Sequence, residues 1–238
     1  MSDRSIFIGY DTTQDLAFKV ARGSMLRRLG RTIHIHAIVL NDVRSLGMYW
    51  REHELREGRW WDVISDAPMS TEFANTRFLV PKLSRSKWAL FTDSDVLALE
   101  DVNFLFDTAQ EKYAVMCVKH NHVPTNTHKM GNQLQTVYPR KNWSSVVLFN
   151  CEHPANEKLT IDMINTVPGR DLHRFCWIED DELIGDIHPR WNWLAGHSSE
   201  HIVPSMVHYT DGTPNMPGYE NTPYASAWWD EAKRLRLT

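Results

Sequence analysis

The residues with the clearest chemical potential are two aspartates, Asp93 and Asp95, which follow the apolar run Trp88–Thr92. A short, nearly continuous apolar run is typical of a strand covered on both faces, as in a parallel sheet flanked by helices. Two carboxylates held together at the end of such a strand repel each other and lose hydration, and a divalent cation relieves both penalties. A D-x-D pair also occurs in solvated acidic turns, so the preceding strand is what favours a metal site here.

A second group of acids lies later in the chain, where five carboxylates fall within residues 179–186 without a basic residue among them. Such a cluster is either a surface loop of mutually repelling charges or a site where the fold supplies hydroxyl, amide or cationic partners. The second interpretation makes these carboxylates candidates for catalysis.

Hydrophobic periodicity predicts a scaffold of alternating strands and helices for these residues. We expect strands at 5–10, 32–40, 61–64, 88–92, 113–118, 144–149 and 202–209, and helices at 13–29, 48–57, 71–83, 156–166 and from 225 onward. Pro81 should end or kink the helix at 71–83, because proline lacks an amide donor and clashes with the preceding turn. This order predicts an α/β fold. Such sheets bind ligands at the carboxyl ends of their strands, where Asp11, Asp93 and Asp95 all fall.

Composition narrows the class of protein. The 238 residues are 42% hydrophobic and 24% charged, which is typical of globular proteins. A net charge of −4 excludes a global field that would attract nucleic acid. Three cysteines without a C-x-x-C pair suit a reducing compartment, and no apolar run reaches the roughly 20 residues of a membrane span. We therefore expect a cytoplasmic protein that has no transmembrane segment and binds no nucleic acid.

Several segments resemble, in the same order along most of the chain, the glycogenin-like GT-A glycosyltransferases. The stretch 73–106 contains an Arg-bearing helix near a proline, a strand that ends in D-x-D, and a turn of the family's dLxxLf type. The segments 5–11, 144–150 and 207–212 resemble the family's first strand, its NaGvllfN strand and its terminal H-x-x-G metal motif. The resemblance implies one GT-A domain over 1–238, with a Rossmann-like mixed sheet of mostly parallel strands flanked by helices. Its nucleotide-binding half would be 1–110 and its acceptor-binding half 111–238.

The same resemblance implies roles for individual residues. Asp93, Asp95 and His208 would hold Mn²⁺ or Mg²⁺, and oxygens of a nucleotide diphosphate would fill the remaining positions. Arg77 would contact the nucleotide-sugar donor, because its planar fork of donors suits ribose, phosphate or sugar oxygens. The rest of the expected donor site comprises Ile8, Tyr10, Asp11 and Thr12 at the end of the first strand, Ser94 between the two aspartates, and Gly212, whose turn can aim backbone amides at an anion.

The acidic segment lies where the family has D-Q-x-x-L-N. Asp180 and Asp181 then occupy the Asp and Gln places, whereas a slip of one residue puts Asp181 and Glu182 there. The first carboxylate would hold hydroxyls of the donor sugar, and the second would stabilise or attack an oxocarbenium-like centre. The run Trp177-Ile-Glu179-Asp180 also resembles the acidic loop that carries the general base of inverting GT-A enzymes. The retaining and inverting outcomes therefore both stay open.

The resulting prediction is a hexosyltransferase that moves a sugar from a nucleotide-diphosphate donor, a UDP-sugar, to a hydroxyl of a glycan, lipid-linked or small-molecule acceptor. Two alternatives remain. The family's Lys-Pro-Trp stretch is absent after His208, which favours a non-catalytic sugar-nucleotide or glycan binder of the same fold. A haloacid-dehalogenase-type phosphatase also places D-x-D after an apolar strand, but that strand comes first in its chain, and Thr or Val stands at the position of Leu97.

The final predicted helix pairs two tryptophans, Trp228 and Trp229, with three basic residues in its last turns. This composition occurs in helices that pack against a core and in helices that lie on anionic membranes. We expect a packed helix first and a peripheral membrane contact second.

Overall fold

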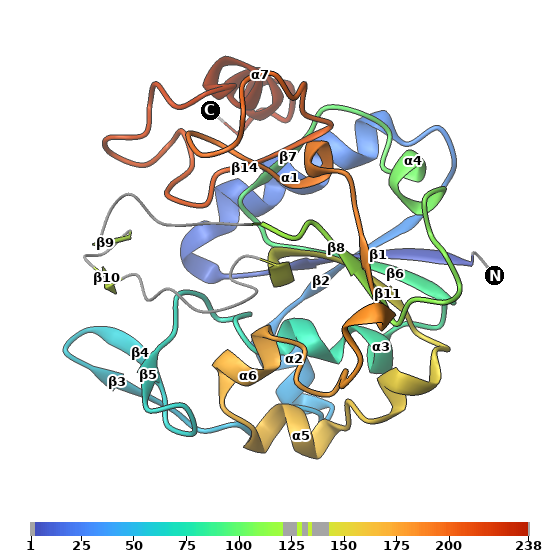
Figure 1. Cartoon of the computed structure of the whole chain (residues 1–238). Coiled ribbons are helices and arrows are strands. Elements are labelled where there is room, and N and C mark those ends of the chain that lie inside the picture. Colours follow the sequence, from blue (N-terminus) through green and yellow to red (C-terminus); the bar gives the residue numbers. More distant parts are fainter. Residues whose placement is uncertain (1–2, 121–127, 130–132, 135–142, 238) are drawn as a thin grey trace.

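A six-stranded mixed sheet forms the centre of the structure, in the order β12-β8-β11-β6-β1-β2 (Figure 1). The structure is a computed structural model that describes residues 3–120, 128–129, 133–134 and 143–237. One strand, β11, runs antiparallel to both of its neighbours, and the other pairs in this sheet are parallel. The predicted α/β fold with mostly parallel strands is therefore confirmed. The strands are β1 (Arg4–Gly9), β2 (His34–Ile38), β6 (Trp88–Thr92), β8 (Val115–Cys117), β11 (Val146–Asn150) and β12 (Ile184–Asp186).

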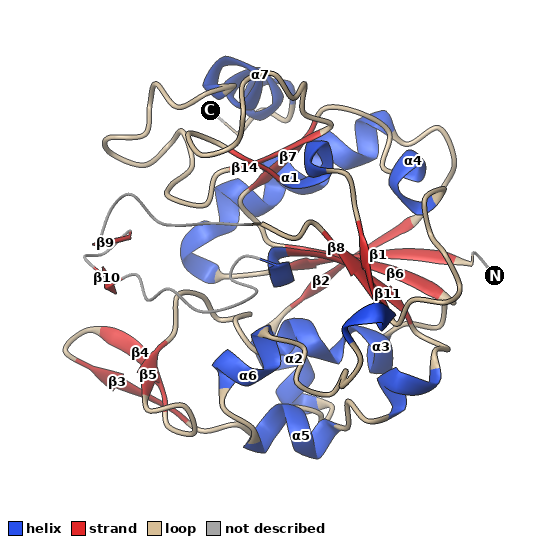
Figure 2. Ribbon diagram, in the orientation of Figure 1, coloured by secondary structure: helices blue, strands red, loops and turns tan. Residues whose placement is uncertain are grey.

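Helices lie on both sides of this sheet (Figure 2). Ile6 and Ile8 of β1 pack in the core layer that contains Met25 of α1, whereas Phe7 packs in the opposite layer with Phe78. Successive side chains of a strand point to opposite faces, so a strand buried on both faces reads as a continuous apolar run. One side carries α1 (Asp15–Arg28), α4 (Asn103–Phe106) and α7 (Ala225–Arg234), and the other carries α2 (Leu40–Ser45), α3 (Val80–Leu83), α5 (Ile161–Thr166) and α6 (Gly169–His173).

A smaller sheet extends the centre where β6 ends. Its order is β13-β14-β7, and its strands are β13 (Trp193–Leu194), β14 (Met206–His208) and β7 (Val96–Ala98). The antiparallel register of β14 and β7 pairs His208 with Val96, the residue that follows Asp95. This pairing brings the C-terminal part of the chain beside the D-x-D segment. A separate two-stranded pair is formed by β9 (His128–Lys129) and β10 (Gln133–Leu134).

The helix predicted at 48–57 is wrong, because this region begins a three-stranded antiparallel sheet of β3 (His53–Arg56), β4 (Arg59–Asp62) and β5 (Ala67–Pro68). Glu57 and Gly58 have φ values of 49° and 78°, and they form the two-residue turn between β3 and β4. Two positive φ values are typical of the hairpin turns that match strand twist. Arg51 is buried and donates from Nε and Nη2 to the two oxygens of Asp62, each at 2.6 Å. The turn and this ion pair together stabilise a hairpin in place of the helix that was predicted at 48–57.

The helix predicted at 71–83 is shorter than expected. A 3₁₀ turn at Thr76–Leu79 leads into α3, and Pro81 lies in the first turn of that helix. Proline is tolerated at this place, because the first amides of a helix have no intrahelical partner. Pro81 thus helps to begin a helix instead of ending one. The segment still delivers Arg77 to the sheet edge where β6 ends.

The C-terminal helix α7 packs against α1, as expected. Trp228 is fully buried, and Glu231, which is 2% exposed, forms an ion pair with Arg27 of α1 at 2.6 Å. This packing leaves the second expectation, a membrane contact through α7, without support. Among the residues that the structure describes, no helix is long and apolar enough to span a bilayer. The cytoplasmic location stays a prediction.

Candidate metal centre and donor site

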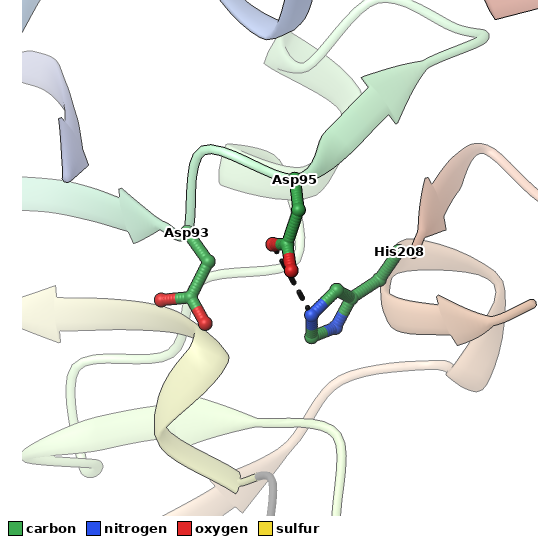
Figure 3. A group of neighbouring side chains, drawn as sticks. All are labelled: Asp93, Asp95 and His208. Atoms are coloured by element: carbon green, nitrogen blue, oxygen red, sulfur yellow. Dashed lines mark ion pairs between the residues drawn. The ribbon is translucent and has the colours of Figure 1, made fainter. Parts of the chain in front are cut away.

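Asp93, Asp95 and His208 converge at the carboxyl end of β6, where their side chains point toward a common space (Figure 3). One ligand-type atom of each lies within 4.8 Å of the others. His208 Nε2 lies 3.3 Å from Asp95 Oδ1. His208 is buried, whereas the two aspartates are partly buried. Two carboxylates and one imidazole form a donor set that suits a divalent cation such as Mn²⁺, so the residues fit the metal that the sequence predicted.

Different elements fix each residue of the connection between β6 and β7. The Asp93 N–H donates to the carbonyl of Ser145 at 2.9 Å, and the Asp95 carbonyl accepts from the Tyr209 N–H at 2.9 Å. The buried Ser94 hydroxyl donates to Gln14 Oε1 at 2.7 Å. The two carboxylates are therefore held in place by the surrounding fold. The Ser94 side chain serves this anchoring, so a donor contact through its hydroxyl stays a prediction.

Arg77 lies at the same site and contacts one of the aspartates. Its Nη1 is 2.8 Å from Asp93 Oδ1 and donates to the carbonyl of Ser144 at 2.8 Å. The guanidinium also lies over the ring of Phe91, 4.9 Å from its centroid. This buried cation offsets part of the negative charge of the carboxylate pair. Sequence reasoning placed Arg77 on the donor; the structure places it on Asp93, and a donor contact remains a prediction.

A second residue, Asn192, contacts the ring nitrogen of His208 that faces away from Asp95. The His208 Nδ1 lies 2.8 Å from Oδ1 of Asn192, whose Nδ2 donates to the hydroxyl of Ser145 at 3.0 Å. Asn192 is fully buried. Sequence reasoning missed both Asn192 and Ser145. Asn192 belongs to no recognised motif, and Ser145 lies in the segment 144–150 but was given no role there.

The residues expected to cradle the nucleotide at the end of β1 have local roles. Ile8 is fully buried in the core, so its side chain cannot reach a ligand. The Asp11 carboxylate accepts from the backbone N–H of Thr13 at 2.8 Å and from that of Glu72 at 2.9 Å. It thus caps the 3₁₀ turn Thr12–Gln14, as side chains at helix N-termini commonly do. The Tyr10 hydroxyl donates to Asp15, and Thr12 hydrogen-bonds Glu72.

The turn expected to bind an anion is closed on itself. The Gly212 N–H donates to the carbonyl of Tyr209 at 3.0 Å, so this amide already has an acceptor. A Cβ at position 212 would lie 2.5 Å from Cδ2 of Tyr219, which explains the glycine by close packing. The neighbouring Asp211 contacts His197 Nε2 at 2.6 Å. Sequence reasoning missed this pair. It brings the His197 imidazole against the turn after His208, where the Lys-Pro-Trp stretch of the glycogenin-like family is absent.

The acidic segment does not reach the metal cluster. Asp180 and Asp181 are exposed and precede β12. β12 runs parallel to β6, so these residues lie near the amino ends of the parallel strands, whereas Asp93 follows the carboxyl end of β6. Across the sheet the register aligns Ile184 with Val115, Phe149 and Ala89. Ala89 lies four residues before Asp93, about 13 Å along the strand, and β12 lies three strands from β6, about 14 Å across the sheet. Ile184 therefore lies roughly 20 Å from Asp93, and Asp180 and Asp181 precede Ile184 in the chain.

This placement gives no support to the expectation that Asp180 or Asp181 faces the donor sugar. The Asp180 carboxylate accepts from the Glu182 N–H, which makes it the cap of a short 3₁₀ turn. Glu179 forms an ion pair with Lys158 at 2.8 Å. Lysines from other segments, not a substrate, thus supply cationic partners to this acidic stretch, and Asp186 pairs in the same way with Lys119 at 3.2 Å.

Comparison with known proteins identifies a family. No family model matches the chain. Protein CDI from Arabidopsis thaliana is 43% identical over 232 residues, which cover 95% of this chain and 85% of that protein. This chain belongs to the CDI family. An identity of this size over nearly the whole length means that the CDI protein shares the fold described above.

Solved structures of glycosyltransferases have a similar fold, of the GT-A type. The galactosyltransferase LgtC, solved with donor and acceptor sugar analogues, gives a TM-score of 0.61 at 14% identity over 97% of this chain and 95% of its own. GlyE of Streptococcus pneumoniae gives 0.58 at 14% identity over 96% of this chain. The chain spans 60% of the length of GlyE. At these identities the likeness shows the fold alone, and the glycogenin-like subfamily stays a prediction.

Proposed function

We propose that this protein transfers a sugar from a UDP-sugar to a hydroxyl acceptor with a divalent cation held by Asp93, Asp95 and His208. The observation that carries the proposal is the convergence of these three side chains at the carboxyl end of β6. Ligands of open α/β sheets bind at this edge. The GT-A fold shared with LgtC and GlyE supports a glycosyltransferase over the other classes.

The residues of the site have different roles, which follow from their charges. The two aspartates and the His208 imidazole hold the cation, which, when bound, neutralises the diphosphate as it leaves the sugar. Arg77 keeps Asp93 in place from the buried side. The two carboxylates are partly exposed, and diphosphate oxygens of the donor would supply further ligands to a bound cation. Mn²⁺ or Mg²⁺, the UDP moiety and the acceptor class are parts of the proposal.

Calorimetry with UDP, with and without Mn²⁺, followed by a hydrolysis assay over a panel of UDP-sugars, tests this function. We expect UDP to bind tightly only when Mn²⁺ is present, and we expect at least one UDP-sugar to be hydrolysed. Binding without turnover of any donor would instead support the non-catalytic sugar-nucleotide binder. If UDP does not bind in either metal condition, both functions are wrong. The phosphatase alternative is not favoured, because the structural neighbours are glycosyltransferases.

The position of the acidic segment leads to a separate prediction. Asp180→Asn and Asp181→Asn should keep donor turnover within about twofold of the parent, because these exposed carboxylates precede β12 at the end that lies away from the cluster. The same hydrolysis assay measures this, with Asp95→Asn as the variant that loses turnover. A drop of 100-fold or more in either variant would contradict the placement and restore these residues as catalytic.

A further inference from the structure

We infer that Asn192 is a positioning residue that keeps His208 in the tautomer required of a metal ligand. The inference rests on the metal-binding part of the proposed function. A neutral imidazole carries its proton on one nitrogen and a lone pair on the other, and only the lone pair can bind a metal. The nitrogen that faces the cluster is Nε2, so the proton must lie on Nδ1.

The hydrogen bonds around Asn192 set the direction of this proton. The Asn192 Nδ2 donates to the Ser145 hydroxyl at 3.0 Å, and the amide oxygen of Asn192 lies 2.8 Å from His208 Nδ1. An amide oxygen carries no hydrogen, so the hydrogen in this contact comes from Nδ1. Histidines that bind metals generally donate their second N–H to such an oxygen, which fixes both ring orientation and tautomer.

Asn192 acts against a competing arrangement within the same site. Asp95 Oδ1 lies 3.3 Å from Nε2, and a carboxylate this close favours a proton on that nitrogen. A proton on Nε2 would satisfy Asp95 and at the same time block the metal position. The buried Asn192 oxygen favours the opposite tautomer, with the proton on Nδ1. Without that proton, the Asn192 oxygen would face the lone pair of Nδ1 in a buried place where no water can replace the lost hydrogen bond, which is costly.

The backbone links the same asparagine to the aspartates. Asn192 ends the 3₁₀ turn Pro189–Asn192 directly before β13, whose Leu194 pairs with His208 in the parallel register of β13 and β14. Its partner Ser145 accepts the Asp93 N–H through its carbonyl at 2.9 Å. One buried amide thus joins the histidine ligand to the segment that fixes the first aspartate.

Titration of the protein with Mn²⁺ in the absence of nucleotide tests the inference. Asn192→Ala should weaken Mn²⁺ binding roughly 10- to 100-fold, whereas Asn192→Asp, which keeps an acceptor oxygen beside Nδ1, should bind at least as well as the parent. Ser145→Ala should give an intermediate loss. Asn156→Ala is the matched control, because Asn156 is an equally buried asparagine that bonds Ala114 and Trp177 and is expected to leave Mn²⁺ binding unchanged.

Nitrogen-15 NMR of the histidine rings without metal gives a second readout. The parent should carry the His208 proton on Nδ1, and Asn192→Ala should shift it to Nε2. If Asn192→Ala does not fold, Ser145→Ala and Asn192→Asp carry the test. Parental Mn²⁺ affinity in Asn192→Ala, or an equal loss in the Ala and Asp variants, overturns the inference. A parent with the Nδ1 proton that binds no Mn²⁺ would instead overturn the metal part of the proposed function.

Discussion

Replacing Asp95 with asparagine is expected to abolish metal-dependent nucleotide binding while the protein stays folded. The substitution preserves volume and removes one of the two negative charges that hold the cation. Loss of a residue that only hydrogen-bonds a metal ligand already weakens metal binding roughly 10- to 100-fold. Loss of a ligand itself should therefore weaken UDP binding in Mn²⁺ by at least about 100-fold. Calorimetry with UDP and Mn²⁺ measures this, and circular dichroism reports on folding.

Asp95 is a cleaner target than Asp93. Asp93 is paired with the buried Arg77, and removal of one partner of a buried pair is destabilising by about 3–5 kcal/mol because it leaves an uncompensated charge. Asp186→Asn is a suitable control, since Asp186 is an exposed aspartate at a strand end that pairs with a lysine. UDP affinity in Mn²⁺ that is unchanged in Asp95→Asn would refute the metal assignment.

The second large effect is expected for His208→Ala, as a change in metal preference. Imidazole binds manganese and later transition metals well and calcium poorly, because calcium prefers oxygen ligands. Loss of His208 should therefore weaken Mn²⁺ binding roughly 10- to 100-fold while Ca²⁺ binding changes by less than about threefold. The ratio of the two dissociation constants, measured by titration with each metal, is the readout.

The matched control for this experiment is His197→Ala. This imidazole pairs with Asp211 in the neighbouring turn and is not one of the three clustered side chains. It should leave the ratio of Mn²⁺ to Ca²⁺ affinity at the parental value. An equal loss for both metals in His208→Ala would mean that the ring supports the site mechanically instead of binding the metal.

The sequence by itself determined the central strand, the aspartates at its end and the α/β class. These inferences succeed because their signals are local. A strand covered on both faces is mostly apolar, as residues 88–91 of β6 are. Carboxylates directly after such a strand lie where it ends, at its carboxyl end. The ligand role of His208 needed a family resemblance, because no local pattern connects it with Asp95. The β14 and β7 pairing then brought the two side by side.

Other features depended on tertiary structure. The acidic composition of residues 179–183 carries no information on which end of β12 they precede, and the sheet order and register place them beside the end that lies away from Asp93. The hairpin at 53–62 replaced a predicted helix because a buried ion pair between Arg51 and Asp62 formed across it. Asn192 became a partner of His208 through the pairing of β13 with β14. In each case the deciding contact joins residues from different elements, and local propensity cannot anticipate such contacts.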